Sequence, residues 1–109
     1  MKAHFFFSIY AGAGQAFGKA DIDVEIDSVP PIGSRVALHT LVRNSSEAAE
    51  RALSVPECLL EIVAVEKRSS SMVAVELDDA VFESKATAAS VVTRLVEMGF
   101  DCDIWKGGN

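Results

Sequence analysis

His4 and His39 are the only histidines in the chain, and histidine is the side chain most often used as a general base near neutral pH. Ser8 follows His4 within one apolar segment. If this segment is a strand, the two side chains lie about 13 Å apart at about 3.3 Å per residue. A nucleophile and its base need a hydrogen bond of about 2.6–3.2 Å. Local spacing therefore predicts no catalytic triad, and we assign no catalytic residue from the sequence.

His39 has a different expected partner. If a strand at residues 35–43 pairs with the preceding acidic strand, and both aliphatic faces point inward, one register sets Asp23 opposite His39 and Asp27 opposite Arg35. Cross-strand pairs of opposite charge stabilise a sheet. We therefore interpret His39 as a structural ion-pair partner rather than a catalytic base.

A glycine-rich segment follows the first apolar stretch, with Gly12, Gly14 and Gly18 close together. Phosphate-binding loops use glycines to bring the backbone close to a phosphate at a helix N-terminus. The spacing here is one residue longer than the usual fingerprint, and residues 15–20 leave no room for the helix. We therefore predict no cofactor, and we interpret the segment as a hairpin loop whose glycines adopt positive φ. Such a loop can still close over a ligand.

The first apolar stretch has two different faces when it is read as a strand. Phe5, Phe7 and Ile9 form an apolar face, while His4 and Tyr10 belong to a mixed one. The aromatic groups of the mixed face fit a dimer interface, and the alternative is a small-molecule pocket. If a ligand binds, the candidate residues are His4, Phe6, Tyr10, Gly12, Gly14, Gln15 and His39.

Acidic and aliphatic residues alternate without a break from Asp21 to Asp27. This period of two predicts a strand with one wet face. Its carboxylates are about 6.6 Å apart along the strand, whereas calcium needs oxygen ligands at about 2.3–2.6 Å, so we predict no metal site. We interpret the face as solvated, and the alternative is an acidic surface that binds a basic protein.

The composition restricts the possible partners. The chain has 109 residues, a formal net charge of −6 and a mean hydropathy of +0.25, and 50% of its residues are hydrophobic. The acidity excludes nucleic acid as the expected partner, because phosphate neutralisation needs clustered Lys and Arg. No polybasic or lipidation signal predicts membrane binding. A small domain has difficulty burying so much apolar surface, so we expect a homodimer.

The N-terminus and the cysteines bear on the compartment. Lys2 and the apolar run at residues 5–13 resemble a signal peptide faintly, but we expect the segment to be retained and the protein to be cytoplasmic. Cys58 and Cys102 lack metal-type spacing. We expect both to be small buried hydrophobic residues without a disulfide between them.

Periodicity, turn residues and helix caps predict a single α+β domain over residues 1–109. Asn44 and Glu47 fit the start of a short helix, and Ser84 and Gly99 fit the two ends of a longer one. The expected strands are 3–11, 21–27, 35–43, 58–66, 72–78 and 100–104, and the expected helices are 45–53 and 84–98.

The predicted sheet has about six mostly antiparallel strands. We expect it to be curled, partly like a barrel, and packed against the C-terminal helix. The alternative is a ferredoxin-like βαββαβ unit formed by residues 35–105 and extended by an N-terminal hairpin.

No motif identifies a reaction or a family. The leading hypothesis is a homodimeric, non-enzymatic binding module of the accessory kind found in mobile elements and phages. The alternative is a small-molecule-binding protein or an enzyme that uses a pocket beside His4, Tyr10 and the loop at residues 12–18. A deep closed pocket with titratable groups would favour the alternative, and a flat apolar face would favour the module.

Overall fold

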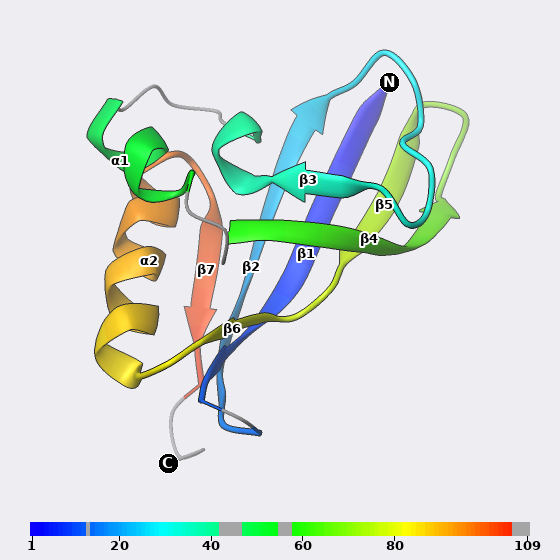
Figure 1. The fold of residues 1–109 in the computed structure, drawn as a ribbon. Coiled ribbons are helices and arrows are strands. Elements are labelled where there is room, and N and C mark those ends of the chain that lie inside the picture. Colours follow the sequence, from blue (N-terminus) through cyan, green and yellow to red (C-terminus); the bar gives the residue numbers. More distant parts are fainter. Residues whose placement is uncertain (13, 42–46, 55–57, 106–109) are drawn as a thin grey trace.

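A computed structural model describes residues 1–12, 14–41, 47–54 and 58–105 (Figure 1). The predicted α+β class with a mostly antiparallel sheet is confirmed. The described elements are β1 (Lys2–Ala11), β2 (Ala16–Glu25), β3 (Arg35–Ala37), the 3-10 turn η1 (Leu38–Thr40), α1 (Glu47–Ala52), β4 (Leu59–Lys67), β5 (Met72–Leu77), β6 (Ala80–Phe82), α2 (Lys85–Glu97) and β7 (Asp101–Ile104).

The strand order is β3-β4-β5-β1-β2-β7, and β6 pairs with the far end of β1. Neighbouring strands are antiparallel, except that β1 runs parallel to β5 and β6. The sheet is not closed. The ferredoxin-like alternative is not confirmed, because β1 and β2 lie between β5 and β7 instead of extending a separate unit.

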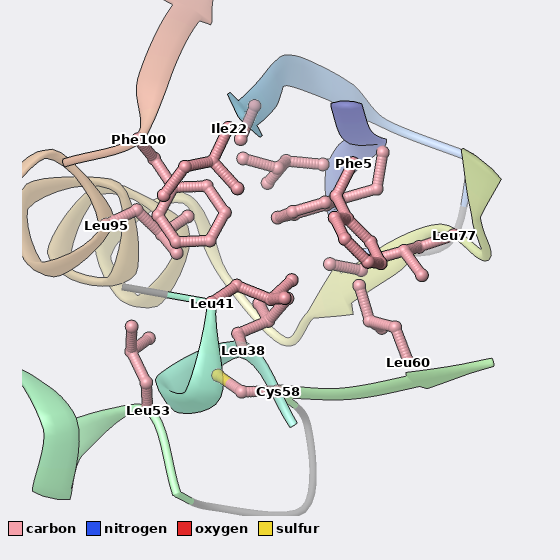
Figure 2. Close-up of a cluster of buried hydrophobic side chains, with 14 of the residues drawn as sticks. Phe5, Ile22, Leu38, Leu41, Leu53, Cys58, Leu60, Leu77, Leu95 and Phe100 are labelled. Carbon is pink, nitrogen blue, oxygen red and sulfur yellow. The ribbon is translucent and has the colours of Figure 1, made fainter. Parts of the chain in front are cut away.

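The hydrophobic core lies on one face of β1 and β2. In Figure 1, β3 and β4 cross in front of these strands, and α2 lies beside β7. Figure 2 shows Phe5 of β1 and Ile22 of β2 facing Leu38 of η1 and Leu60 of β4. Leu95 of α2 lies at one side of this cluster. Among the described residues, no polar or charged side chain is buried. The alternation of β1 therefore separates a dry face from a partly wet one, as predicted.

The C-terminal helix and the strand hairpin follow their sequence signals closely. The Ser84 hydroxyl accepts a hydrogen bond from the Thr87 amide at 3.2 Å, which caps α2. Gly99 has a φ of 103°, the left-handed conformation that glycine adopts after a helix. Leu95, on the apolar side of α2, is fully buried. The predicted hairpin between 58–66 and 72–78 is also confirmed, because β4 and β5 pair in antiparallel fashion.

The predicted strand at 35–43 is wrong over residues 38–41, where the chain enters η1, and residues 42 and 43 lie outside the described ranges. Leu38 and Leu41 are 0% and 6% exposed, and residues three apart share a face in a 3-10 turn but not in a strand. The chain therefore leaves the strand conformation here, because the 3-10 turn buries both leucines and a continued strand would bury only one of them.

The expected pairing of this strand with the acidic strand is also wrong. β3 pairs with β4, where Arg35 lies opposite Glu61. The proposed pairs of Asp23 with His39 and of Asp27 with Arg35 do not form. The strand β6 was not predicted. The predicted short helix is described from Glu47 as α1, and its expected cap at Asn44 lies outside the described residues.

Candidate functional site

One face of the sheet is not covered by any helix or strand among the described residues. We call it the open face. It lies on the side of β1 and β2 away from the core, and its half-buried side chains alternate with core residues along β1. The register places Asp23 opposite His4, Asp21 opposite Phe6 and Lys19 opposite Ser8. The open face consists of His4, Phe6, Ser8 and Tyr10 on β1, Lys19, Asp21 and Asp23 on β2, and Met72 and Ala74 on β5.

His4 and Asp23 form the most ordered polar contact on this face. The His4 Nδ1 and the Asp23 Oδ1 are 2.6 Å apart, and the two side chains are 33% and 38% exposed. The His4 ring also stacks on Phe6, with centroids 5.8 Å apart. This orients the imidazole as in a catalytic dyad. Ser8, however, lies four residues along the same strand, about 13 Å away, and cannot act as its nucleophile.

The open face and the turn between β4 and β5 carry three shallow hollows, with volumes of about 250, 210 and 400 Å³. The first hollow is lined by His4, Phe6, Phe7, Ser8, Lys19, Ala20, Asp21 and Arg68. The second is lined by His4, Arg68, Met72 and Ala74. The third is lined by Met1, Lys2, Glu25, Ser69, Ser71 and Met72.

These hollows are neighbours. The first and the second share His4 and Arg68, and the second and the third share Met72. Together they make a continuous row, which we call the groove. An extended ligand fits this shape better than a compact one, because each hollow is open to solvent.

The groove contains several of the cations of this acidic protein. Lys2, Lys19 and Arg68 line it, together with the N-terminal ammonium. Glu25 lies 3.4 Å from that ammonium, and the Arg68 Nε lies 4.0 Å from a Glu66 carboxylate oxygen. Within the described ranges, the Lys19 ammonium has no carboxylate within 4.0 Å. The first hollow therefore has cationic side chains that could bind an anionic group of a ligand.

The other candidate residues lie elsewhere. Tyr10 is beside Ala16 and Val81, beyond the hollows. Gly12 and Gly14 have φ values of 90° and 73°, which confirms the predicted positive φ for these two, and together with Gln15 they form the β1–β2 turn. The prediction is wrong for Gly18, which lies in β2 without a positive φ, because the hairpin loop ends before Ala16.

His39 lies in η1, away from the open face. Its Nδ1 is buried and has no hydrogen-bond partner among the described residues. Of the predicted ligand residues, the structure brings only His4 and Phe6 together at the groove.

Sequence reasoning missed the contributions of Lys19, Arg68, Met72 and Ala74. Arg68 lies between the strands expected at 58–66 and 72–78, but no local signal shows that this connection reaches His4. The parallel pairing of residues 2–6 with 72–76 brings them together, and such a contact between distant segments has no local periodicity to reveal it.

Cys102 of β7 is half-buried and close to two carboxylates, whereas Cys58 is fully buried. Burial, together with the nearby negative charges of Asp21 and Asp101, raises the pKa of the Cys102 thiol from 9.0 to about 11, and burial is the largest of these causes. Cys102 therefore remains a neutral thiol near neutral pH, which is the unreactive form.

We expect Cys102 to react slowly with iodoacetamide. At pH 8 its thiolate population should be about 100-fold smaller than that of an ordinary cysteine, because each pKa unit changes the population about tenfold. The rate should rise as the pH approaches 11, and Asp101→Asn should increase it at fixed pH. Mass spectrometry of the alkylated peptide measures both rates. Alkylation at pH 8 as fast as that of a short cysteine peptide would contradict the assignment.

Within the described ranges, no group of three or more His, Cys, Asp or Glu side chains is arranged to hold a metal ion. The described helices also include none with the length and apolar character needed to cross a membrane. Comparison with protein-family models, curated proteins and solved structures gives no match. The functional argument therefore depends on the geometry of the open face.

Proposed function

We propose that the protein is a small, non-enzymatic binding module that holds an extended segment of a partner protein in the groove. The supporting observation is the open face itself, which carries a row of connected shallow hollows. Enzymes usually enclose their reactants in one deep cleft. The His4–Asp23 contact has no nucleophile within reach, so its role in this proposal is to hold the stacked His4 ring in place.

The fold explains why this face is available. We infer a curled packing in which β3, β4 and α2 bury one side of β1 and β2, so that the core does not need the other side. Phe6 and Met72 then remain half-buried on that side, and Ala74 forms a small floor between them that is 3% exposed. Partly exposed apolar groups with a polar rim are typical of recognition surfaces.

The partner need not be a second copy of the chain. The accessible surface is 6195 Å², close to the roughly 5,800 Å² of a folded monomer of this mass. The chain is therefore about as compact as a folded monomer of its size, although large hydrophobic residues such as Ile32 and Val81 remain exposed, and the homodimer stays a prediction. Cys58 and Cys102 are not joined by a disulfide, and because disulfides are rare in reducing compartments, a cytoplasmic setting is part of the proposal. An accessory role of the mobile-element or phage kind is likewise proposed.

Selection from a display library of short random peptides tests the function. Peptides enriched on the wild-type protein should bind Ala74→Leu at least about tenfold more weakly, a difference of about 1.4 kcal/mol. The larger side chain projects into the second hollow and occupies it. Ala89→Leu is the matched control, because it makes the same change on the exposed surface of α2.

Circular dichroism and thermal melts would establish that each variant is folded. If Ala74→Leu unfolds, Met72→Ala removes a wall of the same hollow without adding volume. Peptides that bind the wild type and both groove variants with equal affinity would contradict the proposal, and so would a library that yields no enriched peptide.

A further inference from the structure

We propose that the segment bound in the groove is acidic and aromatic, with a carboxylate in the first hollow and an aromatic side chain in the second. The inference rests on the proposed function and adds the chemistry of the partner. The charges and apolar groups that line the two hollows support it. It differs from the basic partner that the acidic strand indicates in the sequence alone.

The first hollow is suited to a carboxylate. Lys19 and Arg68 both line it, and neither is held by a close ion pair among the described residues: Lys19 has none within 4.0 Å, and Arg68 is at 4.0 Å from Glu66. Ser8 adds a hydroxyl that can donate a hydrogen bond. Asp21 is the one carboxylate among the lining residues. Within the lining itself an anionic group would therefore meet two cations and one carboxylate, while Glu66 beside Arg68 and Glu76 opposite Phe6 lie outside the lining.

The second hollow is suited to a flat apolar group. It is lined by Met72, Ala74 and the ring of His4, with Arg68 as its one charged side chain. Methionine sulfur makes favourable contacts with aromatic rings. The His4 ring is already held by Asp23 and by stacking on Phe6, so its orientation costs little to fix when a second ring packs against it.

The spacing of the two hollows fits an extended chain. Both contain His4 and Arg68, so they are adjacent on the sheet. In an extended peptide, side chains two residues apart lie on one face about 6.6 Å from each other. An aromatic residue and an aspartate separated by one residue would therefore reach the two hollows together.

The acidic strand does not favour a basic partner as strongly as its sequence indicates. Asp23 is bonded to His4 at 2.6 Å, and Glu25 is paired with the N-terminal ammonium at 3.4 Å. Asp27 lies beyond the end of β2. Only Asp21 remains to attract a cation in the first hollow. The cationic side chains are Lys19, which precedes the acidic run on β2, and Arg68 at the β4–β5 turn, and the sequence pattern of residues 21–27 shows neither.

Titration with defined, capped peptides tests the inference by fluorescence anisotropy at about 0.15 M salt, where long-range repulsion from the net charge is screened beyond about 8 Å. The first peptide carries phenylalanine and aspartate two residues apart among serines. The second replaces the aspartate by asparagine, and the third replaces it by arginine. We expect the aspartate peptide to bind best.

The double variant Lys19→Gln/Arg68→Gln should weaken the aspartate peptide at least about tenfold, or about 1.4 kcal/mol, and should leave the asparagine peptide nearly unchanged. The matched control is Lys85→Gln/Arg94→Gln, which removes the same charge from α2. Equal losses in both double variants would overturn the inference.

Preference for the arginine peptide would also overturn the inference, and it would establish a basic partner while leaving the proposed binding function intact. Failure of all three peptides to bind would overturn the inference as well. In that case the display selection decides separately whether the groove binds any segment. The two proposals therefore fail through different measurements.

Discussion

Leu95→Ala is expected to lower the free energy of unfolding by about 2–5 kcal/mol, the range observed when a large aliphatic side chain is removed from a packed core. Leu95 is fully buried in α2, and Figure 2 shows it beside Phe100 and on the flank of the core. The substitution leaves a cavity that the surrounding strands cannot fill without moving. A domain of this size is stabilised by about 5–15 kcal/mol in total. The substitution should therefore remove a large part of its stability and raise the unfolded fraction.

Urea denaturation followed by circular dichroism measures the change. Val96→Ala is the matched control, because Val96 lies next along the same helix and is 53% exposed. It should change the free energy of unfolding by less than about 0.5 kcal/mol, as surface substitutions usually do. Similar losses for both variants would show that α2 does not pack through the Leu95 stripe.

The features that the sequence predicted correctly are those with a local physical cause. The alternation of β1 identifies its core face, because Phe5 and Phe7 must be buried together. The helix from Ser84 onward has its cap, its apolar stripe and its terminal glycine within one continuous segment. In each case the residues that determine the structure are close in sequence, so the sequence alone is enough to predict the element.

The features that were missed depend on which segments pair. The strand predicted at 35–43 was paired with the acidic strand so that both aliphatic faces point inward, whereas β3 pairs with β4. A period of two fixes which side chains share a face, but it does not fix which strand lies beside them. The same limit applies to the groove, since Arg68 reaches His4 only through the pairing of β1 with β5.

The His4–Asp23 contact depends on the register of the β1–β2 hairpin. The β1–β2 connection is a short hairpin, because the Ala11 amide donates to the Gln15 carbonyl at 2.8 Å. Turn length fixes the register of a hairpin. The turn closed by Ala11 and Gln15 sets Asp23 opposite His4 only because the register shifts by one residue between Ile9 and Tyr10. The sequence does not mark this bulge, so it could not have predicted the register.

The β2–β7 pair should be the most sensitive part of the sheet to an added methyl group. Gly18 is buried opposite Ile104, and a Cβ built on it would lie 2.3 Å from the Asp103 carbonyl oxygen and 3.2 Å from the Ile104 Cα. Both are backbone atoms, so no side-chain rotation can relieve the contact. The close approach of the two backbones, rather than a special φ, is the reason for glycine at this position.

Gly18→Ala is therefore expected to cost about 1–3 kcal/mol, as overpacking usually does, and to loosen β7 before the rest of the sheet. Trp105 reports the movement, because its amide donates to the Phe17 carbonyl at 2.9 Å and it is the only tryptophan in the chain. Hydrogen exchange at the Trp105 amide and tryptophan fluorescence should both change. Gly14→Ala is the comparison: its φ of 73° strains an alanine, but no atom lies within 4 Å of the added Cβ. It should lower stability without exposing the Trp105 amide, whereas unchanged exchange in Gly18→Ala would mean that β7 tolerates the methyl group.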